Sequence, residues 1–401
     1  MEILQRENYC LSCEHVLEEK GWVFEDKKPY VATPISTEKK YCERCKQLIE
    51  PNIEEVSSDC NKFISALKNP KIKVVAYVAP SVRSGIGECF SVEGDCQHKI
   101  VSALKKLGCY SVFSMNFGAD LTIMEESKEF EERLSSGNNL PLLTSCCPAW
   151  VNYIYKIYPA IKPNLSTCKS PQQMMGSIIN TYYAKIKGFD NTDLFVVSIV
   201  PCVSKKIERL RFGINSSKGF DVDSCITTVE LARIIKDNNI DFSNLEDTPF
   251  DELFEHYSGS AAAFGAAGGV SEAILRNIDP NFEIIEQTES TIVEKKVLLN
   301  GKTIYIAQIE GLINTKELIE SILKNNCKYH LVEVMSCSGG CIGGAGQPFN
   351  KEGLPTRRKI LQSSKEKAKI KQAKDNPIIK QLYKTFLTNQ TAQNLLHEKR
   401  D

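Results

Sequence analysis

Four cysteines follow short apolar runs, and their sulfurs have the chemistry to bind a metal centre. Cys147 follows "PLLTSC", Cys202 follows "LFVVSIVP", and Cys337 and Cys341 follow "YHLVEVMS". Four thiolates hold either a four-iron cubane or a tetrahedral zinc ion, although any one buried cysteine alone is more simply a small core residue. Glycines crowd the loop around the last two cysteines, so the backbone can approach a bulky inorganic cluster. A zinc ion alone does not require that clearance.

Cys146 stands directly before Cys147 and raises a separate question. Neighbouring side chains in an extended segment point to opposite sides, so we expect one of the pair to ligate and the other to act differently. Pro148 follows and suits the first turn of a helix, where the dipole lowers the pKa of a thiol. A free thiol at this place could donate and accept protons near neutral pH.

Upstream, the segment "MEESKEFEER" places Glu126, Glu129 and Arg133 three and then four residues apart. This spacing puts all three side chains on one face of a helix. A surface stripe of ion pairs is the plainer interpretation. The alternative is a proton relay whose members lie within hydrogen-bond reach of each other.

The elements that must position these residues are β-branched strands alternating with amphipathic helices. Strands are predicted at residues 73–79, 110–115, 140–145, 194–200, 303–309 and 330–335. Helices are predicted at 95–108 and 227–239, and residues 271–300 are expected to form an irregular connection. This alternation predicts an α/β fold with two lobes of largely parallel sheets flanked by helices. Since sites in such folds gather beyond the carboxyl ends of strands, the metal site is expected between the lobes.

The N-terminal residues are polar and lack the long periodic apolar pattern of the rest of the chain. This difference predicts a small Cys-rich domain at 1–68 and a catalytic domain at 69–401. Two Cys-x-x-Cys units supply four metal ligands, namely Cys10, Cys13, Cys42 and Cys45. Zinc, a single iron or an iron–sulfur cluster all suit this set, and Cys60 is an alternative ligand. Residues 356–374 form a basic run, expected to be a solvated helix face or a docking patch for an acidic electron carrier.

Composition excludes several classes of protein. A chain of 401 residues can bury a core without disulfides, so its 16 cysteines are better explained by metal or redox chemistry. Lys plus Arg equals Asp plus Glu at 50 each, which argues against nucleic acid and anionic membranes as partners. The N-terminus lacks a signal-peptide pattern, and no apolar run approaches the roughly 18 residues of a membrane span. We therefore expect a cytoplasmic protein.

Three segments, "TSCCPAW", "PCVSKKIE" and "EVMSCSGGCIGGAGQP", resemble in order and separation the signature motifs of the iron-only, or [FeFe], hydrogenases. The resemblance covers roughly residues 71–400 and includes "VAPSVR", "FGADLTIMEE", "NLSTCKSPQQ", "FGAAGGV" and the closing "AQNLLH". It implies interconversion of protons and electrons with dihydrogen at an H-cluster. That cofactor is a 4Fe-4S cubane bridged through a cysteine sulfur to a diiron unit carrying carbon monoxide, cyanide and an azadithiolate.

The resemblance also implies roles for individual residues. The cubane ligands would be Cys147, Cys202, Cys337 and Cys341, the last of them bridging. The proton route would be formed by Cys146, Glu126, Ser166, Glu129 and Arg133. The cyanide ligands would be held by Lys205, which Glu208 orients, and by Pro80 with Ser81. The diiron pocket would be lined by Gln172, Phe264 and Met335. Such donors suit the chemistry, because anionic ligands in a dry cavity need a charged or hydrogen-bonding partner.

The sequence departs from the commonest family pattern at Val200, Ala149, Ala345 and Ala267, where methionine, glycine, glycine and threonine are usual. These changes leave ligation intact and bear on turnover rate and direction. The two N-terminal Cys-x-x-Cys units also stand in place of the ferredoxin-like Cys-x-x-Cys-x-x-Cys runs that many family members carry. Iron is slightly favoured there over a structural zinc, because zinc has no redox chemistry and could not pass electrons to the cubane.

The implied partners are H2 and protons, a ferredoxin-like electron carrier, and the maturation proteins that supply the diiron unit. Two other functions remain as alternatives. One is a hydrogen-sensing regulatory protein with the same cluster, and the other is an iron–sulfur assembly factor that lacks the diiron unit. Intact Lys205, Met335 and Gln347 argue against the assembly factor.

Overall fold

The computed structural model describes residues 59–211, 213–216, 219–288, 290 and 292–399, together with the backbone of a short hairpin. The strands of that hairpin are β1 (Trp22–Phe24) and β2 (Ala32–Pro34), which pair antiparallel. The cysteines expected to bind the N-terminal metal lie outside the described residues, namely Cys10, Cys13, Cys42 and Cys45.

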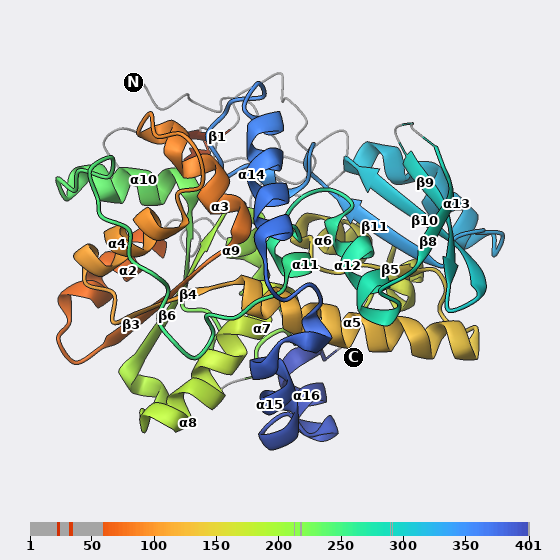
Figure 1. Ribbon diagram of the computed structural model, residues 1–401, viewed down its shortest axis with the longest axis horizontal. Helices are drawn as coiled ribbons and strands as arrows, with labels where there is room; N and C mark the ends of the chain where they lie inside the picture. Colours follow the sequence, from red (N-terminus) through yellow and green to blue (C-terminus); the bar gives the residue numbers. More distant parts are fainter. Residues whose placement is uncertain are drawn as a thin grey trace.

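The first sheet has four parallel strands and lies on the left of Figure 1. In sheet order they are β4 (Ser111–Ser114), β3 (Lys73–Val78), β6 (Leu194–Val200) and β7 (Ser224–Thr227). Nearly all of their residues are buried, as expected where a parallel sheet is covered on both faces. Helices that pack in this lobe include α2 (Asp59–Lys68), α4 (Gln97–Leu107) and α10 (Thr228–Asp237).

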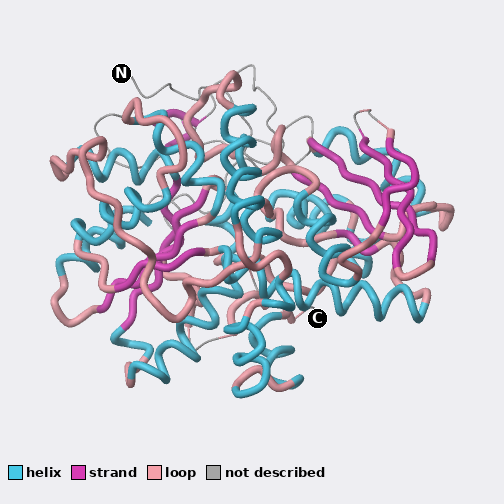
Figure 2. Tube along the Cα trace, in the orientation of Figure 1, coloured by secondary structure: helices cyan, strands magenta, loops and turns pink. Residues whose placement is uncertain are grey.

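The second sheet has five strands and is mixed. In sheet order they are β5 (Leu142–Leu143), β11 (Leu331–Met335), β10 (Lys302–Glu310), β9 (Ile292–Leu299) and β8 (Glu283–Gln287). The first three are parallel, and β9 and β8 continue the sheet antiparallel. The surrounding helices are α6 (Pro148–Ile157), α12 (Gly269–Ile278) and α13 (Lys316–Leu323). Figure 2 shows the strands in two groups separated by helices and loops, which confirms an α/β fold with two lobes.

The helix α5 (Asn116–Ser136) spans the two lobes from below. Its residues Phe117 and Leu121 are buried in the core of the first lobe, whereas Ile123 and Phe130 are buried in a core of the second. The helix ends at Gly137, whose φ of 73° suits a glycine C-cap. Because α5 is anchored on both sides, the side chains between its anchors have fixed positions relative to both sheets.

Other elements complete the connections. The remaining helices are α3 (Pro80–Gly85), α7 (Pro171–Ile178), α8 (Ala184–Lys187), α9 (Ser204–Glu208), α11 (Gly259–Ala262), α14 (Leu354–Lys367), α15 (Pro377–Thr385) and α16 (Asn389–Leu396). Short 3₁₀ or π turns are η1 (Ile86–Cys89), η2 (Pro159–Asn164), η3 (Ile179–Tyr183), η4 (Asn191–Asp193), η5 (Leu312–Thr315), η6 (Cys341–Gly343) and η7 (Ala373–Asp375). Among the described residues, no helix is both long and apolar enough to cross a membrane.

One sequence-based expectation about the fold was wrong, and another was confirmed only in part. Residues 271–300 are not an irregular connection, because they contain most of α12 and the strands β8 and β9. These strands were not predicted because this edge of the sheet is exposed to solvent. Every residue of β8 is exposed, and "VEKK" interrupts the apolar pattern of β9. The basic run at 356–374 is helical only in part, because α14 ends at Lys367 and a short 3₁₀ turn, η7, begins at Ala373.

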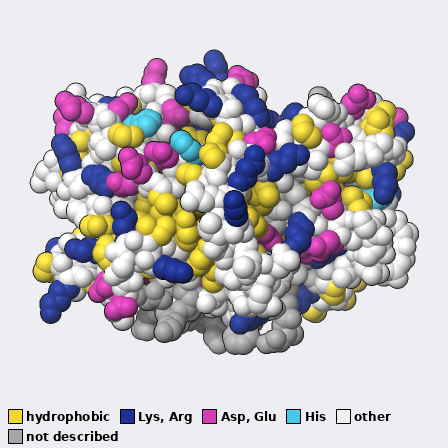
Figure 3. Space-filling view, turned by 60° about the horizontal axis from the view of Figure 1, so that its bottom comes forward, with side chains coloured by type: hydrophobic (Ala, Val, Ile, Leu, Met, Phe, Trp, Pro, Cys, Tyr) yellow, Lys and Arg dark blue, Asp and Glu magenta, His cyan; other side chains and the backbone are white. Residues whose placement is uncertain are grey.

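The surface carries both signs of charge, in keeping with the balanced composition. On the face shown in Figure 3, Lys and Arg side chains are intermixed with Asp and Glu, and hydrophobic side chains lie between them. The basic residue Arg357 of α14 is not part of a solvated face, since it is 1% exposed and its guanidinium pairs with Glu88 at 2.6 Å.

Candidate active site

One cavity lies where strands from both sheets end. It contains about 800 Å³ of space free of protein atoms, part of it open to solvent. The segments that follow β3, β4 and β6 of the first sheet and β5 and β11 of the second all contribute to its wall. Since parallel strands of each sheet deliver their carboxyl ends to one edge, this is the place where an α/β fold gathers a site.

The structure brings the four cysteines expected to hold the cubane to this cavity, namely Cys147, Cys202, Cys337 and Cys341. Cys147 is the N-cap of α6, and burial raises the pKa of its thiol while the backbone N–H groups of Trp150, Ser336 and Ala149 oppose that rise. N–H groups pointing at a sulfur stabilise its thiolate form, which is the form that ligates metals.

The backbone around these cysteines is bare where it approaches the cavity. At Gly340, φ is +78° and a Cβ would lie 2.6 Å from the backbone nitrogen of Ala267. At Gly344, a Cβ would lie 2.4 Å from the backbone oxygen of Pro201. Both glycines line the cavity. Larger residues would therefore displace the loop that carries Cys341, because the backbone of neighbouring segments packs directly against both glycines.

Cys146 also lines the cavity, and its side chain is 8% exposed. The expectation that a helix dipole lowers the pKa of this thiol was wrong. Burial raises the pKa of Cys146 well above its ordinary value, and the nearby Glu126 carboxyl and the Cys341 sulfur raise it further. The N–H groups of the first turn of α6 act on Cys147 instead, so Cys146 keeps its proton at neutral pH.

A buried cation lies at the rim of the cavity. The Lys205 Nζ donates to the backbone oxygen of Cys146 at 2.9 Å and to Glu208 Oε2 at 2.9 Å. Burial alone would lower the pKa of Lys205, but the Glu208 carboxylate outweighs burial and raises it. Glu208 is fixed in turn by the Ser170 hydroxyl at 2.9 Å and the Gln172 amide at 3.2 Å. Lys205 is therefore a fixed positive charge that faces the cavity.

The cavity wall contains a second polar group. The Ser81 hydroxyl is buried, lines the cavity beside Pro80 at the start of α3, and has no hydrogen-bond partner among the described residues. Buried hydroxyls normally find a partner. This orphan and the Lys205 ammonium are the groups that anionic ligands inside the cavity require. The rest of the wall is largely apolar and includes Phe264 and Met335.

The sites where this chain departs from the common pattern fall into two groups. Val200 and Ala149 line the cavity, and they stand two residues from Cys202 and Cys147 respectively in the sequence. Ala345 and Ala267 are not among its lining residues.

A chain of hydrogen-bonding groups leads away from the Cys146 side of the cavity. Glu126 is fully buried and accepts a weak hydrogen bond from the backbone N–H of Ser145 at 3.4 Å. The Ser166 hydroxyl interacts with Glu126 and donates to Glu129 Oε2 at 2.8 Å. The Arg133 Nη2 donates to Glu129 Oε1 at 2.6 Å. These residues are not the solvated ion-pair stripe that their spacing most simply suggests.

The two glutamates of this chain differ in their protonation. Burial raises the pKa of Glu126 to about 8, and the charge of Glu129 adds to the rise. Burial would also raise the pKa of Glu129, but the Arg133 guanidinium and hydrogen bonds from Ser166 and Thr167 hold it below its ordinary value. Glu126 therefore carries a proton at neutral pH while Glu129 is ionised, an arrangement suited to passing protons between them.

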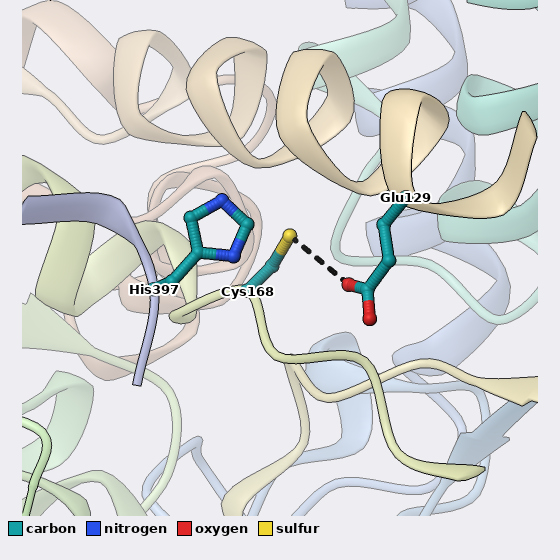
Figure 4. Close-up of side chains that lie close together, drawn as sticks. All are labelled: Glu129, Cys168 and His397. Atoms are coloured by element: carbon teal, nitrogen blue, oxygen red, sulfur yellow. Dashed lines mark hydrogen bonds between the residues drawn. The ribbon is translucent and has the colours of Figure 1, made fainter. Parts of the chain in front are cut away.

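Sequence reasoning missed a cluster on the far side of Glu129. Figure 4 shows Cys168 and His397 beside this glutamate, and the Cys168 Sγ donates to Glu129 Oε2 at 3.6 Å. Neither Cys168 nor His397 is among the candidate site residues that the sequence suggested. The available signal was the position of Cys168 two residues after Ser166. Its proximity to His397 depends on tertiary structure and leaves no local pattern.

Two other cysteines lie in the core of the first lobe, away from the cavity. Cys60, considered as an alternative ligand of the N-terminal centre, is fully buried in α2 within the core of the first lobe. Its neighbour Asp59 forms an ion pair of 2.5 Å with Arg209, and both of these side chains are fully buried. Cys225 is likewise a fully buried core thiol on β7.

Comparison with known proteins agrees with this geometry. Residues 72–345 match the family described as "Iron only hydrogenase large subunit, C-terminal domain", and residues 351–399 match "Iron hydrogenase small subunit". Iron hydrogenase 1 of Clostridium pasteurianum is 38% identical over 347 residues, which cover 82% of this chain and 60% of that protein. The chain therefore spans about three fifths of that relative's length.

The chain is also similar to a periplasmic hydrogenase subunit, to an iron–sulfur assembly component and to solved structures. The periplasmic [Fe] hydrogenase large subunit of Nitratidesulfovibrio vulgaris is 38% identical over 296 residues, covering 70% of each chain. Cytosolic iron-sulfur assembly component 3 of Rattus norvegicus is 29% identical over 369 residues, covering 84% of this chain and 75% of that one. Among solved structures, HydA(deltaEFG), described as revealing stepwise H-cluster assembly, is 31% identical with a TM-score of 0.75. It covers 84% of this chain and 97% of that chain. This chain belongs to the iron-only hydrogenase family.

Proposed function

We propose that this chain is a hydrogenase that interconverts protons and electrons with dihydrogen. The observation that carries the proposal is the composition of one cavity wall. Four thiols, a buried ammonium and an orphan hydroxyl face the same space, and a protonated thiol beside them leads to a buried carboxyl. A zinc site would need the thiols but would have no use for the other groups.

The cavity fits an H-cluster. Cys147, Cys202, Cys337 and Cys341 would hold the cubane, and Cys341 would bridge it to the diiron unit. Lys205 would hold one cyanide ligand, while the other would take the Ser81 hydroxyl that lacks a partner. When bound, the cluster supplies redox-active iron and an amine base. The protein's own part is to position and shield these groups.

Apolar side chains of the wall would limit contact between a bound cluster and water, and other side chains would carry its protons. Phe264, Met335 and Val200 present apolar surface to the cavity. Cys146 holds a proton at Sγ, and Glu126 holds one at its carboxyl because burial raises both pKa values. We propose that protons move between Cys146 and solvent through Glu126, Ser166, Glu129 and Arg133. Arg133 is the last member of this proposed route, and its Nη1 donates to the backbone oxygens of Asn139 and Asn164 at 2.9 Å each.

Electrons would come from an external ferredoxin-like carrier. The four N-terminal cysteines lie outside the described residues, and we propose that they hold a redox-active iron centre, with a structural zinc as the alternative. The basic helix α14 offers exposed cations such as Arg358 and Lys367 for an acidic carrier. Maturation proteins would supply the diiron unit. A cytoplasmic location stays a prediction, since one relative is described as periplasmic.

A second candidate function is iron–sulfur cluster assembly without a diiron unit. The similarity to cytosolic iron-sulfur assembly component 3 favours it, because that alignment covers 84% of this chain at 29% identity. The intact Lys205, the orphan Ser81 hydroxyl and the protonated Cys146 favour the hydrogenase. These groups surround the space beyond the four thiols, where a cubane carrier needs none of them.

Gas measurement on matured protein tests the proposal. The full chain, produced with hydrogenase maturation proteins and given a reduced viologen dye, should evolve hydrogen. The variant Cys341→Ala should evolve none, because it lacks the sulfur that would join the two parts of the cluster. A fully matured wild-type chain with iron in the cubane but no hydrogen production would refute the enzyme and favour the assembly role.

A further inference from the structure

We propose that Cys168, His397 and Glu129 form a binding site for a soft divalent cation such as Zn²⁺, and that an ion bound there closes the proton route. The second half of this proposal rests on the proposed hydrogenase function. The binding site itself does not. Of the three site residues, Cys168 and His397 are not members of the proposed proton route from Cys146 to Arg133.

The three side chains offer a sulfur, a nitrogen and an oxygen to one point. Their ligand atoms all lie within 4.8 Å of one another, and the Cys168 Sγ is 3.6 Å from Glu129 Oε2. Figure 4 shows the three side chains directed toward a common space from α5, from the segment before α7 and from the segment after α16. Zinc accepts this ligand set, and three protein ligands leave its fourth position for water.

One ring nitrogen of His397 is already held as in a metal site. Its Nε2 lies 2.9 Å from Glu125 Oε2, and the other oxygen of Glu125 accepts a hydrogen bond from the Tyr383 hydroxyl. Ligating histidines usually donate their second N–H to a carboxylate, which fixes the ring and makes the ligating nitrogen more basic. The ligating atom here would be Nδ1, which would exchange its present contact with the Thr167 hydroxyl at 2.8 Å for the ion.

The backbone holds two of the ligands in register. Cys168 and His397 are paired in an antiparallel bridge, and the flanking hydrogen bonds run from Lys169 N to Leu396 O and from Glu398 N to Thr167 O, each at 2.8 Å. Glu129 is fixed by Ser166 and Arg133 as described above. A site on rigid backbone needs little reorganisation on binding, which favours affinity. Glu129 is the partly exposed member of the three, whereas Cys168 and His397 are buried.

Binding must release one proton. Burial raises the pKa of Cys168 well above its ordinary value, so the free site holds a thiol, whereas Glu129 is already a carboxylate. The cation replaces the thiol proton, a metal–sulfur bond forms as the S–H bond breaks, and the proton goes to solvent. Affinity should therefore rise with pH. No electrons are transferred in this step.

The position of the ion explains its expected effect on turnover. Glu129 Oε2 accepts the Ser166 hydroxyl at 2.8 Å, which is the contact proposed to pass protons between Glu126 and Glu129. A cation bound to that oxygen occupies a lone pair that would otherwise accept a proton. It also places positive charge beside the proton route. Proton transfer would then stop without any change at the cavity that holds the cluster.

Metal binding is the first test, and it does not depend on activity. Full-length protein with its cubane in place is dialysed against Zn²⁺ and analysed for metal. Wild type should retain one more zinc ion than Cys168→Ser, and His397→Gln should bind that ion at least tenfold more weakly, as expected for a lost ligand. Cys327→Ser, which removes a partly exposed thiol elsewhere, is the matched control and should match wild type. Equal zinc content in wild type and both site variants would overturn the proposal.

Inhibition is the second test, with each protein compared with its own rate before zinc is added. Zn²⁺ should inhibit wild type and Cys327→Ser reversibly, and a chelator should restore the rate, while Cys168→Ser should resist inhibition. Equal inhibition of all three proteins would refute the site and leave the hydrogenase assignment standing. Retention of the extra zinc by a fully matured wild type without turnover would support the site and refute the proposed function.

Discussion

Replacing Glu126 with glutamine should remove most turnover and yet stabilise the protein. The substitution keeps the size of the side chain and an oxygen that can accept from Ser145 N–H. It removes the proton that burial places on this carboxyl, so the step between Cys146 and Ser166 loses its carrier. General acid–base groups typically contribute about 10²- to 10⁴-fold to rate, and a fall of at least about 100-fold is expected.

The gain in stability follows from the raised pKa. The carboxyl of Glu126 ionises near 4.5 in the unfolded chain but at about 8 in the fold. Between these values the folded state holds a proton that the unfolded state has lost, so wild-type stability falls as the pH rises. At about 1.4 kcal/mol for each pH unit, the penalty at pH 7 is on the order of 3 kcal/mol, and glutamine escapes it.

Denaturant unfolding across the pH range measures this effect, with both proteins in the same state of maturation. The difference between Glu126→Gln and wild type should be small near pH 4.5 and should grow until about pH 8. Glu125→Gln is the matched control, because the adjacent Glu125 has a pKa that hydrogen bonds from His397 and Tyr383 lower in spite of burial. That control should be less stable than wild type at neutral pH. A Glu126→Gln variant with full turnover, or a stability difference that does not change with pH, would refute the reasoning.

Three further predictions concern the cluster and its supply of electrons. Cys146→Ala should keep the infrared bands of the cluster and lose most turnover, and full activity would show that protons take another path. Gly340→Ala should lower the iron content of matured protein because its Cβ meets backbone at 2.6 Å, whereas Gly301→Ala, at a similar φ of +77° with open space around it, should keep full iron content. Equal iron in both variants would contradict the argument. Replacing Cys10 and Cys13 with serine should slow electron delivery from protein donors but not from small dyes, and unchanged rates with both donors would make that centre structural.

The parts of the fold that the sequence predicted are those with strong local patterns. The buried strands β3 and β6 are continuous apolar runs, and α6 begins at Pro148 as its position suggests. The edge strands β8 and β9 were missed because they are held by pairing with β10, and their exposed residues carry no clear alternation. Pairing of this kind is a tertiary effect that overrides weak local preference.

The features of the cavity can likewise be divided into those that the sequence predicted and those that it did not. The cysteines at strand ends were expected to converge, because parallel strands end at one edge. The pKa of Cys146 could not be judged from its place beside a helix, since burial and the Glu126 carboxyl raise it while the N–H groups of the helix act on Cys147. His397 lies far along the chain from Glu129, and only the folded structure brings them together with Cys168.

Infrared spectroscopy of the matured wild-type chain tests the central claim most directly. If the cavity holds a diiron unit between Lys205 and Ser81, the spectrum should contain the sharp bands of iron-bound carbon monoxide and cyanide. Lys205→Ala should shift the cyanide bands, because the ligand loses its charged partner. A matured wild-type protein that carries a four-iron cubane and shows none of these bands would contradict the account.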